Sequence, residues 1–481
     1  MVFSSLIFIC AFLPLFLLVY RSSAHRYKNF VALSFSVLFY SWGAPKFVFV
    51  LLISIVIDFF VSQRLSLLEK SDTNRKKLFI FVLFTNLGIF LYCKYMNFFV
   101  EQVNHLLSTG GFSAVKWTYV VLPIGISFFT FQKLSYLIDV YRGRVEPSKS
   151  LLNYALYVIL FPQLIAGPII RYHDVNKQLI ERDHSGDMMF SGIWRFCLGL
   201  GKKVLIADVL GEVADMAFNT NISSLPVSSA WIGAFCYSFQ IYFDFSGYSD
   251  MAIGLGRMMG FRFLENFNSP YISRNFIEFW RRWHISLTNW MREYLYLPLG
   301  GNRKSKIRTY FNLWLVFVIS GFWHGAAWNF IVWGCYHGFF LTLNRITRSF
   351  KMQPLPAFIS IPVTFLFVTF GWIIFRANDL SHAMRYLLTL TGLGESTTDS
   401  MLIPGTMMDY HALIILGFAI IISFAQVFGN MGSPLKKDLR EYQPKSAKMV
   451  IGQFSVCCII LFASMMSLTT SSFHPFIYFK F

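Results

Sequence analysis

His324 is the residue in this chain whose type and setting best suit catalysis. It lies in the stretch Gly321–Gly325, inside an apolar segment that runs from about Phe311 to Leu343. An ionisable side chain at membrane depth is costly and tends to face a cavity where it does chemistry. Histidine is also the usual general base near neutral pH. The residue alone leaves an alternative open, namely a buried histidine that hydrogen-bonds to a neighbouring helix.

The segment around His324 is too long for one simple membrane span, because about 20 residues cross the hydrocarbon core. Gly321 and Gly325 flank the histidine. Glycine lets the backbone bend or lets another group approach closely. The sequence therefore predicts two helical pieces that meet near His324.

A second histidine, His284, lies in an aromatic and basic stretch from Asn275 to Tyr296. Six residues recur there at helical spacing, while charged and polar residues occupy the other face. The pattern predicts one amphipathic helix in the membrane interface. The six residues are Trp280, Trp283, His284, Leu287, Met291 and Tyr294.

Basic residues cluster around this stretch. Arg281 and Arg282 lie within it, and four more basic residues follow between 303 and 308. Because Arg and Lys match phosphate oxygens well, such a cluster could bind an anionic cofactor. Attraction to anionic lipid head groups is the simpler alternative for any one of these residues.

Other polar residues favour structural roles. His337 is expected to pack against a neighbouring helix or to support the site. Asp244 and Asp250 could orient a base, coordinate a cation or cap a helix, and Gly247 between them makes a capped helix break plausible. No HExxH and no carboxylate–histidine cluster occurs, so no metal site is predicted. Neither GxSxG nor a Walker A motif is present, which argues against a serine hydrolase or an ATPase.

Composition places the chain in a membrane. Of its 481 residues, 55% are hydrophobic and only 14% are charged, whereas a soluble domain carries about 25% charged residues. The net charge of +18 fits cytoplasmic loops beside anionic lipid in the bilayer, and no basic segment forms a soluble nucleic-acid-binding domain. The seven cysteines form no CxxC pair, which indicates neither a disulfide framework nor a zinc site.

The apolar runs predict an all-α integral membrane protein with about ten to twelve membrane helices, including broken or re-entrant pieces around a central polar funnel. We expect a single domain over residues 1–481. Its peripheral helices cover about 1–150, its catalytic core about 151–375 and its C-terminal helices about 376–481. Basic residues follow the first, third and fifth runs, so the N-terminus is predicted to be periplasmic. The runs lie near 3–20, 30–44, 47–63, 78–93, 118–140, 151–170, 191–218, 228–256, 311–347, 356–375, 410–428 and 449–468.

Several motifs resemble the membrane-bound O-acyltransferase family, and within it the branch that O-acetylates bacterial polysaccharides such as alginate. The resemblance covers the chain almost from end to end. Its motifs lie at Met1–Ser5, Leu122–Phe128, Phe161–Pro168, Tyr242–Gly256, Glu278–Leu287 and Pro475–Phe481. The Glu278–Leu287 motif carries it most strongly.

The resemblance implies roles for the two histidines. His324, in the family's Trp-His-Gly motif, would be the catalytic histidine, and His284, in Trp-Arg-Arg-Trp-His, would line the reaction tunnel. The family binds no permanent cofactor and takes acetyl-CoA as its acyl donor, whose phosphates Arg281 and Arg282 would help to hold. The acetyl group would cross the bacterial inner membrane to a periplasmic SGNH-type partner, which passes it to a polysaccharide acceptor.

Other functions stay open at this point. Related branches acetylate peptidoglycan or cellulose, and a D-alanine-transferring branch matches over shorter stretches. A transporter of an intact small molecule would also use broken helices around a polar cavity. A scaffold that only recruits the periplasmic enzyme is a third possibility.

Overall fold

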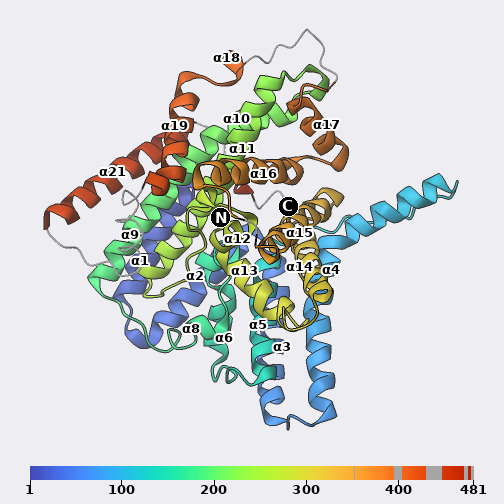
Figure 1. Ribbon diagram of the computed structural model, residues 1–481. Coiled ribbons are helices and arrows are strands. Elements are labelled where there is room, and N and C mark those ends of the chain that lie inside the picture. Colours follow the sequence, from blue (N-terminus) through green and yellow to red (C-terminus); the bar gives the residue numbers. More distant parts are fainter. Residues whose placement is uncertain (352, 395–403, 429–446, 471–474, 478–481) are drawn as a thin grey trace. The chain divides into compact units, whose positions relative to one another are not determined.

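The computed structural model describes residues 1–351, 353–394, 404–428, 447–470 and 475–477, and every regular element in these ranges is a helix (Figure 1). This confirms the predicted all-α class. The closing motif residues Tyr478–Phe481 lie outside the described residues.

The internal contacts of the chain divide it into two compact units. Unit 1 comprises Met1–Ser185 and Leu255–Leu264, and unit 2 comprises Gly186–Gly254 and Glu265–Phe481. The predicted single domain stays a prediction. The helices of unit 1 are η1 (Phe8–Phe12), α1 (Leu13–Ser22), η2 (His25–Tyr27), α2 (Lys28–Gly43), α3 (Phe47–Leu67), α4 (Thr73–Thr109), α5 (Ile126–Arg142), α6 (Leu151–Ile159), α7 (Phe161–Leu164) and α8 (Tyr172–Val175).

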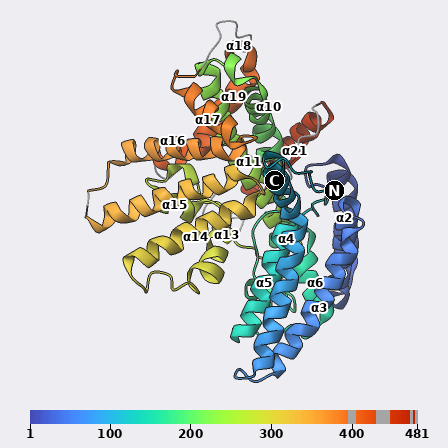
Figure 2. The ribbon, with the colours of Figure 1, turned by 90° about the vertical axis from the view of Figure 1, so that its right-hand side faces the viewer.

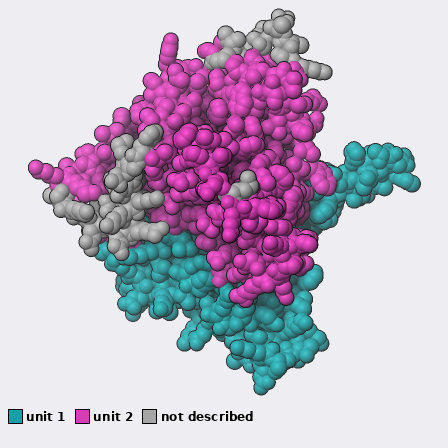
Figure 3. All heavy atoms as spheres, viewed as in Figure 1, with its two compact units in different colours: residues 1–185, 255–264 teal, residues 186–254, 265–481 magenta. Residues whose placement is uncertain are grey.

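Unit 2 holds the remaining helices, except that the last four residues of α11 belong to unit 1 (teal and magenta in Figure 3). In both ribbon views α14 and α15 run side by side (Figures 1 and 2). The helices are α9 (Gly186–Gly201), η3 (Lys202–Ala207), α10 (Asp208–Asn219), η4 (Ile222–Ser224), α11 (Val227–Met258), η5 (Pro270–Ile272), α12 (Phe276–Arg282), α13 (Ile285–Met291), η6 (Arg292–Tyr296), α14 (Lys306–His324), α15 (Trp328–Ser349), α16 (Ala357–Arg376), α17 (Leu380–Leu390), α18 (Pro404–Met407), α19 (Tyr410–Phe424), η7 (Ala425–Phe428) and α21 (Ala447–Thr470).

Five helical segments among the described residues are long and apolar enough to cross a membrane. Shorter helices cover several other apolar runs: α6 ends at Ile159 and α7 begins at Phe161, while α9 continues through the π-helical turn η3 into α10. The total of ten to twelve membrane helices and the polar funnel stay predictions. The five segments are Phe47–Leu67, Thr73–Thr109, Ala357–Arg376, Tyr410–Val427 and Lys448–Thr470.

The apolar run predicted over 118–140 is helical only from Ile126 onward. Gly125 precedes the helix with a φ of +79°, a left-handed conformation that glycine adopts without strain. A Cβ atom at Gly125 would lie 2.6 Å from the carbonyl oxygen of Leu164, so the glycine also permits close packing there. Hydrophobicity continues through this turn, which is why the run alone overstated the helix.

Gly247 does not break a helix, contrary to the prediction, because α11 continues from Val227 to Met258. A Cβ at Gly247 would lie 2.7 Å from the carbonyl oxygen of Gly199 on α9, so the glycine instead allows the two backbones to approach closely. Small residues serve this purpose where membrane helices pack. Asp244 pairs with Lys203 at 2.9 Å, and Asp250 pairs with Lys202 at 2.6 Å. Both aspartates therefore contribute to packing, as predicted, through ion pairs instead of a cap.

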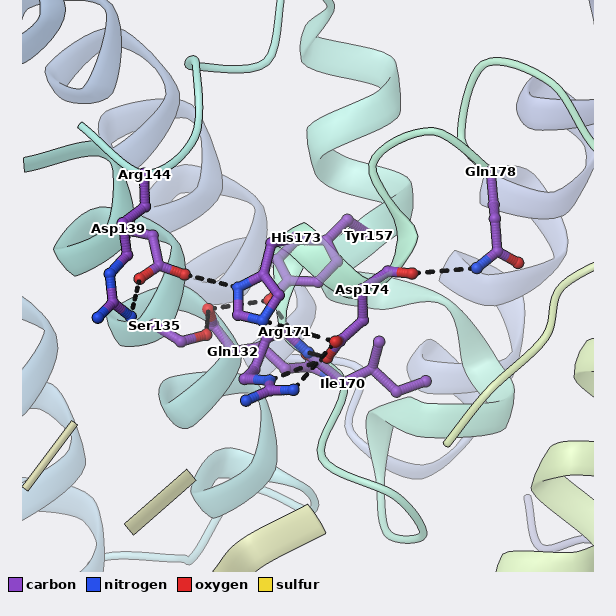
Figure 4. A network of polar contacts seen from close by, with 10 residues as sticks. All are labelled: Gln132, Ser135, Asp139, Arg144, Tyr157, Ile170, Arg171, His173, Asp174 and Gln178. Atoms are coloured by element: carbon purple, nitrogen blue, oxygen red, sulfur yellow. Dashed lines mark hydrogen bonds and ion pairs between the residues drawn. The ribbon is translucent and has the colours of Figure 1, made fainter. Parts of the chain in front are cut away.

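A polar network holds the short helix α8 in unit 1 (Figure 4). His173 Nδ1 lies 2.9 Å from Asp139 Oδ2 on α5, and its Nε2 lies 3.5 Å from Asp174 Oδ1. The Arg171 guanidinium donates to both oxygens of Asp174. The Tyr157 hydroxyl lies 3.1 Å from the main-chain carbonyl oxygens of Gln132 and Ile170, which share its one proton. Two carboxylates thus face one imidazole, an arrangement that favours its protonated form.

This geometry predicts a pH-dependent stability. The hydrogen bond to Asp139 raises the pKa of His173 above its ordinary value of 6.5. The protonated ring therefore stabilises the fold fully below about pH 6.5, and this contribution disappears as pH rises through the higher folded pKa. We expect the difference in thermal unfolding midpoint between the wild type and His173→Gln to shrink as pH rises. The exposed His411, changed to Gln, serves as the control; a difference that grows with pH would contradict the prediction.

Candidate active site

The predicted break at His324 is confirmed. Helix α14 ends at His324, and α15 begins at Trp328. Between them Gly325 is extended, with φ −157° and ψ 150°. The chain then returns along itself, so α14 and α15 pack against each other over most of their length (Figure 2). His324 therefore lies at the turn between two antiparallel helices.

Glycines bring these two helices close together. A Cβ atom at Gly321 would overlap the main-chain carbonyl oxygen of Phe330, and one at Gly334 would overlap that of Phe317. Neither clash can be relieved by a side-chain rotation, because the obstacle is backbone. The position of His324 thus depends on small residues one turn away and on the facing helix.

Gly321→Ala tests this packing. We expect a loss of stability of about 1–3 kcal/mol, the usual cost of forcing an extra group into a packed interior. Thermal unfolding of the purified variant measures the loss. The control is Gly417→Ala, since a Cβ atom there meets nothing within 4 Å. Equal midpoints for both variants would show that α14 and α15 are not held by this contact.

The His324 ring is enclosed by aromatic side chains. Its centroid lies 4.9 Å from that of Trp323, 5.1 Å from Trp333 and 5.5 Å from Phe375, in edge-to-face orientations. Only 5% of the residue is exposed. An imidazole among ring edges and faces is held firmly in one orientation.

His284 interrupts the stretch that was predicted to be one amphipathic helix. Helix α12 ends at Arg282, α13 begins at Ile285, and His284 between them has a φ of +44°. This left-handed conformation is uncommon for a residue other than glycine and tends to occur at functional sites. The interfacial-helix prediction was therefore wrong in its continuity, and the residues of its apolar face are buried inside the protein instead of being left to face lipid.

Asn266 holds His284 in this conformation. Its Oδ1 atom accepts hydrogen bonds from the main-chain N–H and the hydroxyl of Ser286, and it lies 3.0 Å from His284 Nδ1. Its main-chain carbonyl accepts from the N–H of Ile285. Since Oδ1 can only accept, Nδ1 of His284 carries a proton, and in the neutral ring Nε2 then keeps its lone pair. His284 Nε2 is buried and has no hydrogen-bond partner among the described residues.

One indole ring connects the two histidines. Trp323 lies 6.5 Å from His284 and 4.9 Å from His324, measured between ring centroids. The structure thus brings together two residues that are 40 positions apart in sequence. Asn266 belongs to the same cluster, and sequence reasoning missed it. The only available signal was a buried-type amide near the Arg-Arg-Trp-His motif, which is too common a feature to single out.

His337 lies in a packing role. Its Nδ1 accepts a hydrogen bond of 3.3 Å from the Trp280 indole N–H, and its ring packs 4.7 Å from Trp333. Trp333 also contacts His324, so His337 supports the wall behind the candidate site. This agrees with the supporting role predicted from the sequence.

Comparison with known proteins identifies the family. The family model "MBOAT, membrane-bound O-acyltransferase family" matches residues 77–380, which include both His284 and His324. The chain belongs to this family. It is therefore an acyltransferase of the membrane-bound type, as its motifs predicted.

Full-length relatives agree with this assignment. This chain is 38% identical to the "Probable alginate O-acetylase AlgI" of Azotobacter vinelandii over the whole of both chains. It is 43% identical to the protein of the same name from Pseudomonas aeruginosa, over 82% of this chain and 75% of the relative. A "Peptidoglycan O-acetyltransferase" of Helicobacter pylori is 34% identical over all of this chain and 98% of the relative.

The two arginines of this acyltransferase differ in their surroundings. Arg282 donates to Glu278 at 2.8 and 3.0 Å and to the main-chain carbonyl of Asn268 at 3.1 Å. Arg281 is exposed, as are the basic residues at 303, 304, 306 and 308. The geometry thus makes Arg281 the more accessible partner for an anion, while Arg282 braces the loop that carries Asn266.

Proposed function

We propose that this chain transfers the acetyl group of cytoplasmic acetyl-CoA, across a bacterial inner membrane, to a hydroxyl group on a periplasmic SGNH-type partner. The partner then O-acetylates an exported polysaccharide of the alginate class. The observation that carries the proposal is the pair of buried histidines on one indole ring, in a chain that matches alginate O-acetylases from end to end.

The chemistry follows from the two imidazoles. His324 takes the proton of the acceptor hydroxyl while the oxygen of that hydroxyl bonds to the thioester carbonyl carbon. The carbon–sulfur bond then breaks, and CoA leaves as a thiolate that recovers the proton from His324. His284 lies against the same Trp323 ring and lines the site, where its Nε2 lone pair can accept a hydrogen bond from a substrate group other than the reacting hydroxyl. Enclosure by aromatic rings keeps water away from the thioester.

The acceptor polymer is the point at which two functions compete. Sequence identity is 38% and 43% to the two alginate O-acetylases above, against 34% to the peptidoglycan O-acetyltransferase. This difference supports alginate-like exopolysaccharide, with peptidoglycan as the second candidate. We expect a strain that lacks this chain to lose alkali-labile acetate from its exopolysaccharide and to keep normal acetylation of its peptidoglycan. The opposite pattern would favour the second candidate, and no change in either polymer would refute the proposal.

Arg281 gives a separate prediction on the donor side. If its exposed guanidinium contacts a CoA phosphate, Arg281→Glu replaces attraction by repulsion. We expect the KM for acetyl-CoA to rise about tenfold, equivalent to roughly 1.4 kcal/mol, with little change in kcat. Steady-state kinetics in reconstituted vesicles measures this. Arg26→Glu, another exposed arginine, is the matched control, and an unchanged KM in Arg281→Glu would exclude the contact.

A further inference from the structure

Unit 1 contains a cavity of about 490 Å³, and neither candidate catalytic histidine belongs to this unit. Its volume is typical of sites that hold a small molecule. Most of its wall is apolar, with a few polar groups. It is lined by Tyr40, Phe47, Val50, Leu51, Ser54, Asn86, Gly88, Ile89, Tyr92, Cys93, Pro123, Ile126, Phe129, Thr130 and Lys133.

The rim of the cavity lies on membrane-spanning helices. Val50 on α3 and Gly88 and Tyr92 on α4 are all exposed. Both helices are among the five segments that are long and apolar enough to cross a bilayer. In a bilayer, exposed residues on these helices would contact lipid, so the mouth of the cavity would open toward hydrocarbon.

Gly88 lies beside open space at this rim. A Cβ atom there would meet nothing within 4 Å, so no packing contact requires a glycine. Glycine in a helix interior is also less favourable than alanine. The space beside Gly88 at the rim is open, and we call this opening the portal. A ligand would need such an opening to enter the cavity.

The inner wall carries hydrogen-bond donors. Tyr40 is 2% exposed, and its hydroxyl has no partner among the described residues. Lys133 Nζ lies 3.1 Å from Asp58 Oδ2, its one polar contact in the described part of the chain, which leaves ammonium protons available. Asn86 also donates to Asp58, at 2.9 Å. Because Asp58 already neutralises Lys133, a neutral oxygen acceptor suits this wall better than a second anion.

We propose that this cavity binds one acyl chain of a membrane phospholipid. The chain enters between α3 and α4 beside Gly88 and lies against the apolar wall. Its ester carbonyl accepts a hydrogen bond from Tyr40 or from Lys133. When Tyr40 is the donor, the bond satisfies its buried hydroxyl, which otherwise has no hydrogen-bond partner among the described residues.

Photochemical labelling of the full chain tests the proposal. The protein is reconstituted in phosphatidylethanolamine vesicles that contain a phosphatidylethanolamine with a diazirine on one acyl chain, illuminated, and mapped by peptide mass spectrometry. We expect label on the buried wall residues Leu51, Ile126 and Phe129. Label confined to outward-facing residues such as Phe81 and Phe84 would overturn the proposal. The experiment uses the wild-type chain, so it does not depend on the folding of a variant.

A variant sharpens the test. Gly88→Phe fills the portal and should lower wall labelling about tenfold. Gly452→Phe is the matched control, because Gly452 is also exposed on a spanning helix with open space around it, and it should label like the wild type. Equal labelling of the two variants would refute entry at Gly88. A photoreactive fatty acid that labels the wall when the phospholipid does not would refute the phospholipid as occupant.

Discussion

His324→Ala should abolish acyl transfer while the protein still folds and inserts. General acid–base catalysis by a positioned side chain contributes about 10²–10⁴-fold, so we expect a rate loss of at least this order. The imidazole lies at the turn between α14 and α15, in contact with the ring that also contacts His284. The measurement is acetyl ester on the exported polymer, normalised to the amount of inserted protein.

Controls separate chemistry from structure. His411→Ala removes an exposed histidine and should leave acetylation unchanged. His324→Gln keeps a similar volume and should unfold at the wild-type temperature while it remains inactive. Full acetylation by a stably inserted His324→Ala protein would support the scaffold alternative, in which the chain only recruits a periplasmic enzyme.

The second large effect concerns the buried ion pair of Lys133 and Asp58. Both side chains are almost fully buried, and their charged atoms lie 3.1 Å apart. Removing one partner leaves an uncompensated charge, so Lys133→Met should lower the unfolding free energy by about 3–5 kcal/mol. Adding Asp58→Asn to this variant should recover most of the loss. Thermal or denaturant unfolding in detergent provides the double-mutant cycle.

A partly exposed pair offers the contrast. Glu278→Gln breaks an ion pair with Arg282 one helical turn away, which should cost only about 0.2–1 kcal/mol of unfolding free energy.

If the effects of Lys133→Met and Asp58→Asn on the unfolding free energy simply add, the two side chains do not depend on each other. In that case the interaction between Lys133 and Asp58 would contribute no coupling free energy to the stability of unit 1.

The elements around the site were predictable where local chemistry fixes them. The break at His324 followed from segment length and from the glycines beside it. The break at His284 did not, because Asn266, 18 positions away, imposes it through hydrogen bonds that no helical periodicity reveals. The predicted helix break at Gly247 was wrong for a related reason. A glycine that permits close helix packing cannot be distinguished in the sequence from a glycine that permits a turn.

The candidate site was predictable in its members more than in its geometry. The motifs selected His324 and His284, but only the fold shows that Trp323 contacts both. Pairings such as Asp58 with Lys133 join distant spans, and composition alone cannot say which buried charges meet. The difference between Arg281 and Arg282 likewise depends on Glu278 and on a backbone carbonyl, which sequence spacing does not fix.

The central claim, that an acetyl group crosses the membrane by chemistry at His324, is tested most directly with purified protein in sealed vesicles. Acetyl-CoA with separate labels on its acetyl group and on its CoA is placed on one side, and a hydroxyl-bearing acceptor on the other. We predict that the acetyl label alone reaches the acceptor, that CoA stays behind, and that His324→Ala stops the transfer. Passage of both labels together, or transfer that is unaffected in the variant, would contradict this claim.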